Sequence, residues 1–246
     1  MIACLELSDR GGLGYDFKIG LERWYAACSG VSAGACEVGR LFGLGIDGGD
    51  RVCVVKPTPL YLRGGDLVFV TGPSGGGKST ILDLLRAYAV DCDEIFLVEL
   101  GALQAEGGCA LVDCFDDRFA LKEVIGLLSL VGLADAFLLL RGVDQLSVGQ
   151  RFRFDLAYAM SVAMRLSMDG GEDVSILIIA DEFCSALDRV TACVVSRNLR
   201  RLMAWCGLKN IIFVAATGHD DLYEHLEPDV LIDKGLGCDL DILYRD

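Results

Sequence analysis

The sequence predicts an α/β fold in which a mostly parallel sheet is covered by helices on both faces. From residue 51 onward, short apolar runs alternate with longer segments whose apolar residues recur at helical spacing. The short runs are apolar at nearly every position, which is typical of parallel strands buried on both faces. Only four prolines and a hydrophobic content of 53% in 246 residues indicate a folded chain with a sizeable core.

The chain divides into two regions by composition. Residues 1–50 are glycine-rich, contain one helix-like segment at 34–44 and have no evident role, whereas residues 51–246 form the main domain. The stretch "GLGIDG" at 43–48 fits the pattern GxGxxG, which needs a strand before it and a helix after it. Here a helix-like segment precedes the pattern and a strand follows it, so we expect no dinucleotide site there.

The elements of the main domain follow from the same periodicities, with glycines or polar turns between them. The most apolar window, 124–140, is interrupted by Asp135 and two glycines, so paired buried helices explain it better than a membrane span. We expect a helical subdomain at about 114–168. Strands are expected at 51–55, 66–72, 94–100, 109–115, 174–182, 210–217 and 229–235, and helices at 78–90, 119–140, 148–168 and 186–206.

The charge of the chain limits its partners. A formal charge of −14 opposes non-specific binding to nucleic acid or to anionic lipid. The basic cluster "SRNLRR" at 196–201 shares a predicted helix with Arg189. A solvated helix face explains this cluster more simply than a contact with DNA does.

The cysteines and the first residues predict a compartment. Eleven cysteines, an odd number without a CxxC pair, favour buried free thiols in a reducing cytoplasm over disulfides or a zinc site. The start, "MIACLELSDR", has no basic region followed by an apolar stretch, so we expect no signal peptide. Both observations predict a cytoplasmic protein.

A phosphate-binding loop is the most informative motif. "GPSGGGKST" at 72–80 fits GxxxxGK[ST] between a predicted strand and a predicted helix. Glycines let backbone N–H groups converge on phosphate oxygens, and the helix points its partly positive N-terminus at the same anion. Lys78 would reach the β- and γ-phosphates, and Ser79 would ligate Mg²⁺. The expected phosphate-binding residues are Gly72, Pro73, Ser74, Gly75, Gly76, Gly77, Lys78, Ser79 and Thr80.

Two later strands deliver polar residues at their C-terminal ends, where parallel α/β sheets bind ligands. "SILIIADE" ends in Asp181, which suits the Mg²⁺ shell, and Glu182, which suits polarising an attacking water, although acidic pairs also cap helices. His219 follows "IIFVAAT" and could donate a hydrogen bond to the γ-phosphate or be an incidental loop histidine. His225 lies in a polar helix and is expected to be solvated.

A second potential anion site lies in "QLSVGQRFRFDLAYAM" at 145–160. Ser147 and Gln150 form S-x-x-Q, a capping box that precedes a helix. A capped start with small residues also leaves N–H groups and a serine hydroxyl that can hold an anion. One nucleotide cannot be held at two helix starts in different subdomains of the same chain. The simplest use of this second site is therefore to hold a γ-phosphate between two copies of the chain.

Five motifs in this order resemble the ABC-type ATPases. They are "GPSGGGKST", "LSVGQ", "ILIIADE", "SALD" and a histidine after the next strand, and the resemblance covers roughly 52–235. The resemblance implies a P-loop NTPase of RecA-like fold with an abbreviated helical signature subdomain. The pattern "LSVGQRFRFDLA" is most similar to soluble ABC-type ATPases related to those fused to acetyltransferase-like domains.

The resemblance also implies a head-to-tail homodimer that binds two ATP molecules with Mg²⁺ in its interface and hydrolyses them. It makes Lys78, Glu182 and His219 the catalytic residues. The metal ligands would be Ser79, Asp181 and Asp113. The signature residues acting in trans would be Ser147, Val148, Gly149 and Gln150, and Asp188 at the end of "SALD" would couple the two sites.

The chain departs from the family's pattern at several positions. Members carry an aromatic residue that stacks on adenine about two dozen residues before the glycine loop, and here Phe42 or Tyr61 could substitute, or no residue does. Asp113 stands where members have a glutamine that contacts the metal and the coupled partner, and Gln104 comes too early. A glycine is inserted before His219 in "TGHD".

Three functions remain open at the level of sequence. The first is a soluble ATPase that drives an unknown protein or nucleic-acid partner, and the second is the ATP-hydrolysing subunit of a membrane transporter. The third is a nucleotide-gated clamp with little turnover, which the presence of Glu182 argues against. We favour the first, because the segment from Asp113 to Ser147 leaves little room for helices that grip a membrane partner.

Overall fold

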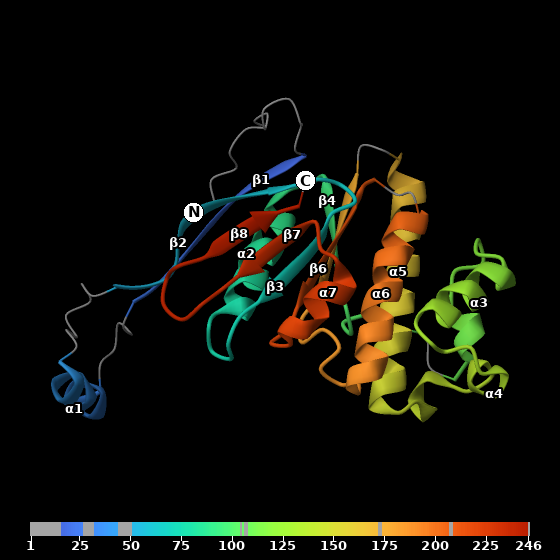
Figure 1. Cartoon of the computed structure of the whole chain (residues 1–246), viewed down its shortest axis with the longest axis horizontal. Coiled ribbons are helices and arrows are strands. Elements are labelled where there is room, and N and C mark those ends of the chain that lie inside the picture. Colours follow the sequence, from blue (N-terminus) through green and yellow to red (C-terminus); the bar gives the residue numbers. More distant parts are fainter. Residues whose placement is uncertain are drawn as a thin grey trace.

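The main sheet has the predicted α/β architecture. The structure is a computed structural model that describes residues 16–26, 32–43, 51–103, 105, 108–171, 174–206 and 209–245. Its six-stranded sheet has the order β4-β5-β6-β3-β7-β8, in which the pairs up to β7 are parallel and β8 is antiparallel (Figure 1). The strands are β3 (Leu67–Thr71), β4 (Ile95–Glu99), β5 (Ser175–Ala180), β6 (Ile211–Ala216), β7 (Val230–Asp233) and β8 (Asp241–Tyr244).

A second sheet contains the long hairpin-like pair β1 (Phe17–Ala26) and β2 (Arg51–Leu62), which is antiparallel. Ile19 and Leu21 of β1 are buried with Val68 and Val70 of β3 in one apolar cluster. The expected division at residue 51 therefore separates two strands that pair with each other. Part of the first 50 residues contributes to the core of the main domain, which their glycine-rich composition did not indicate.

Helices lie on both faces of the main sheet, while α1 lies away from it (Figure 1). One apolar cluster joins the sheet to α2 and the β1–β2 pair, and another joins it to α3, α5 and α6. The helices are α1 (Ala33–Phe42), α2 (Lys78–Asp91), α3 (Leu121–Leu130), α4 (Ala136–Leu139), α5 (Val148–Gly170), α6 (Arg189–Cys206) and α7 (Tyr223–Leu226). Short 3₁₀ turns lie at η1 (Leu111–Cys114), η2 (Val143–Gln145) and η4 (Asp220–Leu222).

The strand expected at 109–115 is wrong. Leu111–Cys114 forms the 3₁₀ turn η1, and only Ala110 makes a bridge, to Gly142. Leu111 and Phe115 are both buried while Asp113 is exposed. In a strand these three side chains would share one face, so the turn keeps both apolar residues in the core without burying a carboxylate.

Three smaller expectations are also corrected or refined. The helix expected at 119–140 is two separate helices, α3 and the four-residue α4, and no helix among the described residues is long and apolar enough to cross a membrane. The strand at 229–235 is not the last, because β8 follows it. The eight cysteines whose side chains the structure describes are free thiols, as expected, but of these only Cys184 is buried and the others are half-buried.

Candidate nucleotide site

The phosphate loop lies between the end of β3 and the start of α2. Gly72, Gly75 and Gly77 have φ angles of 131°, 75° and 104°. Residues with a Cβ rarely adopt these values, so the three glycines allow the loop to turn back on itself. The ammonium group of Lys78 donates hydrogen bonds to the carbonyl oxygens of Gly72 at 2.8 Å and Pro73 at 3.1 Å, and so spans the mouth of the loop.

An acidic pair meets the loop from β5. The hydroxyl of Ser79 donates to Asp181 Oδ2 at 3.4 Å, and Asp181 Oδ1 accepts a hydrogen bond from the backbone N–H of Glu182 at 2.9 Å. Glu182 is exposed and has a φ of 51°, which is uncommon for a residue other than glycine. Such backbone conformations cluster at functional sites.

The end of β6 brings His219 to the same edge of the sheet. His219 is exposed, and its backbone N–H donates to the hydroxyl of Thr217 at 3.3 Å. A Cβ added to Gly218 would lie 3.9 Å from Lys78 Nζ, so the glycine inserted before His219 lies beside the phosphate loop. The hydroxyl of Thr71 donates to Asp220 Oδ1 at 2.5 Å, which joins the ends of β3 and β6.

The donor set suits a hard cation in part. Ser79 Oγ and Asp181 Oδ2 are two oxygen donors on facing elements, the type of ligand that Mg²⁺ prefers. Within the described part of the chain, no three His, Cys, Asp or Glu side chains lie close enough to hold a metal. Asp113, the third expected ligand, lies on η1 in a small pocket with Asp116, Tyr158 and Arg165. The structure thus brings Ser79 and Asp181 together and does not bring Asp113 to Asp181 and Glu182.

The start of α5 has the expected capping box. Ser147 Oγ accepts from the N–H of Gln150 at 3.3 Å, and Gln150 Oε1 accepts from the N–H of Ser147 at 3.0 Å. Val148 is exposed, and Gly149 packs against the turn that contains Ala186 and Leu187. In Figure 1 the start of α6 lies between the start of α5, which Ser147 caps, and the start of α2, so the capped start of α5 is not beside the start of α2 in the same chain.

Asp188 caps helix α6. Its carboxylate accepts from the N–H of Thr191 at 3.0 Å and from the hydroxyl of Thr191 at 2.6 Å. These hydrogen bonds hold the pKa of Asp188 below its ordinary value. The residue expected to couple two sites therefore also fixes the direction of the helix that leaves the "SALD" turn.

The fold agrees with solved structures of transporter cassettes. "Dimeric Structure of MJ0796, a Bacterial ABC Transporter Cassette" matches with a TM-score of 0.55 at 17% sequence identity, over 81% of this chain and 94% of that chain. A dimeric post-hydrolysis state of MJ0796 bound to ADP and Pi matches with a TM-score of 0.53 at 18% identity, over the same 81% and 94%. The chain has the fold of an ABC-type ATP-binding cassette.

Curated proteins resemble the cassette in sequence. The macrolide export ATP-binding/permease protein MacB of Neisseria gonorrhoeae is 30% identical over 196 residues, which cover 68% of this chain and 28% of MacB. MacB of Agrobacterium fabrum is 27% identical over 221 residues, covering 77% and 32%. The lipoprotein-releasing system ATP-binding protein LolD of Idiomarina loihiensis is 54% identical over 39 residues, covering 16% and 17%. The cassette spans less than a third of these MacB proteins, and no protein-family model matches it.

Neither residue expected to stack on adenine lies near the phosphate loop of the cassette. Phe42 is exposed at the end of α1, which lies away from the sheets in Figure 1. Tyr61 is seven residues along β2 from Val54, which borders Gly77, and a strand rises about 3.3 Å per residue, so roughly 23 Å separate Tyr61 from Val54. Gln104 lies outside the described residues, as do 44–48 of the "GLGIDG" stretch.

Trp24, an aromatic residue closer to the loop, was not predicted from the sequence. Trp24 pairs with Cys53 across the β1–β2 sheet, and Cys53 precedes Val54. Trp24 is 45% exposed and lines a groove of about 900 Å³ between β1, β2 and helix α2, whose floor includes Leu84 and Ala87. Its position depends on the pairing of strands that are far apart in sequence, and an aromatic residue at the end of the first strand was the available signal.

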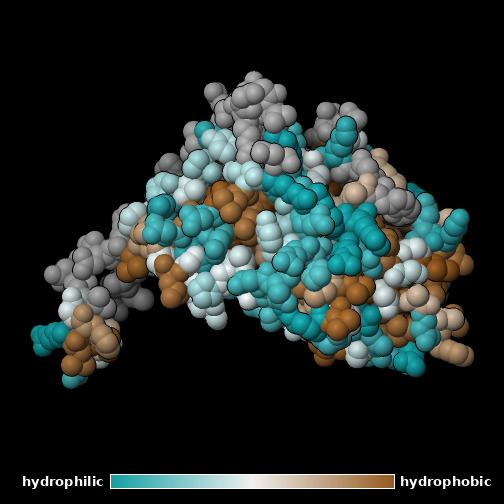
Figure 2. All heavy atoms as spheres, in the orientation of Figure 1, coloured by the Kyte–Doolittle hydropathy of each residue, from teal (hydrophilic) through white to brown (hydrophobic). Residues whose placement is uncertain are grey.

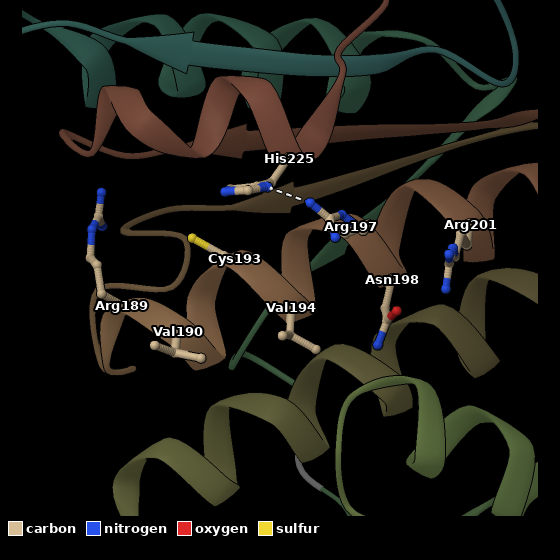
Figure 3. A pocket seen from close by; sticks show the side chains of 8 residues that line it. All are labelled: Arg189, Val190, Cys193, Val194, Arg197, Asn198, Arg201 and His225. Atoms are coloured by element: carbon tan, nitrogen blue, oxygen red, sulfur yellow. Dashed lines mark hydrogen bonds between the residues drawn. The ribbon is translucent and has the colours of Figure 1, made fainter.

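The basic cluster lies on α6, as expected, but on two faces. Arg189, Arg197 and Arg201 line a groove of about 500 Å³ between α6 and α7 (Figure 3). Arg200 points elsewhere and pairs with Asp229. His225 is half-buried and hydrogen-bonded to Arg197 at 3.2 Å, rather than simply solvated.

Proposed function

We propose that the cassette binds ATP with Mg²⁺ and hydrolyses it as one half of a head-to-tail pair. The observation that carries this proposal is the meeting of Ser79 and Asp181 at 3.4 Å beside the phosphate loop, with the capped start of α5 remote from both. No helix start in the described part of the same chain would cover the open side of a nucleotide bound at this loop, so that side would face solvent. A second copy of the chain would supply such a helix start through Ser147 and Gly149.

The residues around the loop divide the chemistry among them. Lys78 would leave the carbonyl oxygens of Gly72 and Pro73 and bind the β- and γ-phosphates. Ser79 and Asp181 would hold Mg²⁺, which supplies charge neutralisation on the phosphates when bound. Glu182 would orient and polarise the attacking water, and His219 would donate a hydrogen bond to the γ-phosphate.

We also propose that Trp24 receives the adenine base. Trp24 lines the groove beside α2, which begins at Lys78 and contributes residues from Asp83 to Asp91 to that groove. A large aromatic face that is only partly covered offers stacking area at little conformational cost. Trp24 takes this role in place of Phe42 and Tyr61.

The partner that we propose is a membrane permease. Proteins named as macrolide export and lipoprotein-releasing ATP-binding proteins share sequence with the cassette, and this supports transport over the soluble role favoured by sequence alone. The α3–α4 region has an exposed apolar surface, seen at one end of the molecule in Figure 2, which suits a protein contact. Its exposed residues are Leu121, Ile125, Phe137 and Leu140.

A non-transport ATPase is the second candidate, and Asp113 favours it. Members of the family contact the coupled partner through a glutamine at this position, and the carboxylate of Asp113 changes that contact. Its pocket of about 310 Å³ is lined by polar groups, including Asp116 and Arg165. Purification from the native membrane distinguishes the candidates, because a transporter cassette stays with a multi-span subunit and a soluble ATPase does not.

The paired site is tested with three variants. In a Glu182→Gln background, which traps ATP, the cassette should change from monomer to dimer on adding MgATP, measured by light scattering. Lys78→Ala should weaken ATP binding about 100-fold or more by removing charge-assisted contacts. Ser147→Arg should bind ATP as the parent does but stay monomeric.

The matched control is Ser129→Arg, an exposed serine on α3 that should dimerise normally. Dimerisation of Ser147→Arg with ATP would contradict the trans role of the α5 start. Full hydrolysis by a monomer of the unsubstituted chain at any dilution would contradict the pairing itself.

A further inference from the structure

A turn after β7 supports the phosphate loop from below. The backbone N–H of Lys234 donates to the carbonyl of Thr71 at 3.0 Å, at the point where β3 becomes the loop. A Cβ added to Gly72 would lie 2.1 Å from the carbonyl oxygen of Lys234, and a Cβ on Gly76 would lie 2.8 Å from it. Two glycines of the loop are therefore required by their contact with Lys234 as well as by the approach of phosphate.

The side chain of Lys234 continues beneath the same loop. It is fully buried, with 0% of its surface exposed. Its Cε would lie 3.5 Å from a Cβ on Gly77, so the aliphatic part packs along the residue that precedes Lys78. Its ammonium group donates to the carbonyl oxygens of Gly235 at 2.9 Å and Gly237 at 2.6 Å.

This ammonium group has no direct counter-ion within the described residues. No carboxylate among them lies within 4.0 Å of Lys234, and nearby Asp239 pairs with Lys56 at 2.8 Å instead. A buried cation is costly unless an opposite charge compensates it. Carbonyl dipoles supply part of that compensation, and a polyphosphate on the other side of the loop would supply the rest.

We infer that Lys234 is a second cation of the phosphate site, acting through the loop from beneath while Lys78 acts by contact. The inference rests on the proposed binding of ATP at this loop. A buried charge is screened little by solvent or salt, so its attraction for a bound anion extends over several ångströms. The gain in binding affinity from Lys234 must grow with the negative charge of the nucleotide, so it should be largest for ATP, smaller for ADP and smallest for AMP.

The test replaces Lys234 with uncharged residues and varies the number of phosphates. Lys234→Gln keeps N–H donors for the carbonyls of Gly235 and Gly237 and removes the charge. Lys234→Met removes both. The matched control is Lys56→Met, which removes the same charge from an exposed lysine beside the same turn. Calorimetry gives the affinities of each protein for ATP, ADP and AMP, at low salt and at high salt.

We expect Lys234→Gln to weaken ATP binding about tenfold, ADP binding less and AMP binding least, with the loss persisting in high salt. Lys56→Met should change each affinity by less than about twofold. Equal losses for all three nucleotides, or no loss, would show a purely structural role and overturn the inference. An unsubstituted cassette that binds no ATP would overturn the proposed function instead.

A second measurement applies if both neutral variants fail to show the cooperative unfolding transition of the parent. The ¹⁵N resonance of the Lys234 ammonium group, identified by its loss in Lys234→Arg, is followed in the unsubstituted cassette. Saturating ATP should shift this resonance and saturating AMP should leave it nearly unchanged. The same shift with both nucleotides would overturn the inference.

Discussion

Ser79 Oγ lies 3.4 Å from Asp181 Oδ2, although 102 positions separate the two residues along the chain. The contact exists because β3 and β5 lie on either side of β6 in a parallel sheet, so their C-terminal ends reach the same edge. Two oxygen donors on facing elements can share one hard cation. The proposed dependence of ATP binding on Mg²⁺ can therefore be tested by substituting these two residues.

Ser79→Ala and Asp181→Asn should remove the Mg²⁺ dependence of ATP binding. In the unsubstituted cassette, we expect chelation of Mg²⁺ to weaken ATP binding about tenfold or more, because the phosphates lose a neutralising charge. In either variant, affinity with and without chelator should agree within about twofold. Nucleotide titrations monitored by fluorescence measure both values. Ser129→Ala, at an exposed serine, should keep the full effect of the chelator.

Gly72→Ala should destabilise the fold by about 3 kcal/mol or more. The added Cβ would lie 2.1 Å from the carbonyl oxygen of Lys234, and the φ of 131° strains any residue other than glycine. Urea unfolding measures the free energy. The control is Gly235→Ala, in the turn that contains Lys234, where an added Cβ would meet nothing within 4 Å. The free energy of unfolding of this variant should stay within about 1 kcal/mol of the parent.

The phosphate loop and the three strands that lead to the site were predictable because each carries an unambiguous local pattern. β3, β5 and β6 are buried at nearly every position, and each is followed directly by a polar or glycine residue at the site edge, namely Gly72, Asp181 and Thr217. Leu111 and Phe115 are four residues apart and would share a side in a strand, so their spacing favoured a strand, whereas in the structure Leu111 begins a 3₁₀ turn and Phe115 follows it. The tertiary core decided between the two.

Two residues near the site could not be found from local sequence. Nothing in "DKG" at 233–235 distinguishes a turn lysine in solvent from one buried beneath a loop, and the burial of Lys234 arises from chain segments that are remote in sequence. Trp24 reaches the groove beside α2 only through the pairing of β1 with β2. Both depend on contacts between distant segments, which periodicity does not encode.

Asp66→Asn should stabilise the cassette at neutral pH and not at pH 4. Burial raises the pKa of Asp66 to about 6, and the neighbouring carboxylate of Asp229 adds to this. The pKa of Asp66 in the unfolded chain is near 3.9, so the folded state holds the proton more tightly. The stability that the protonated Asp66 contributes is therefore lost as pH rises from about 4 to about 6. Asparagine can still accept the hydrogen bond from the N–H of Arg63.

The measurement is the difference in unfolding free energy between Asp66→Asn and the parent at several pH values. The difference should be near zero at pH 4 and reach on the order of 1 kcal/mol at pH 7 in favour of asparagine. Asp117→Asn, at an exposed carboxylate, should show no such trend. A difference that is constant with pH would mean that Asp66 does not hold a proton more tightly in the folded state than in the unfolded state.

Arg200→Ala should destabilise the fold, because Arg200 and Asp229 form a junction between α6 and the main sheet. The guanidinium donates two hydrogen bonds to the carboxylate of Asp229, at 2.6 and 2.9 Å. Asp229 also accepts from the N–H of Leu67 at 2.9 Å, at the start of β3. The bidentate pair raises the pKa of Arg200 above its ordinary value. Removing Arg200 would leave a half-buried carboxylate held by one backbone donor.

The expected loss is about 1–2 kcal/mol, because both side chains remain partly open to solvent, with 32% and 26% of their surfaces exposed. Urea unfolding of Arg200→Ala measures it. Arg201→Ala removes the same side chain at the next position, which faces the α6 groove, and should stay within about 0.5 kcal/mol of the parent. Arg200→Lys keeps the charge without the planar fork and should recover only part of the loss. Equal losses at positions 200 and 201 would mean that helix propensity or net charge, rather than the pairing with Asp229, sets the stability at this junction.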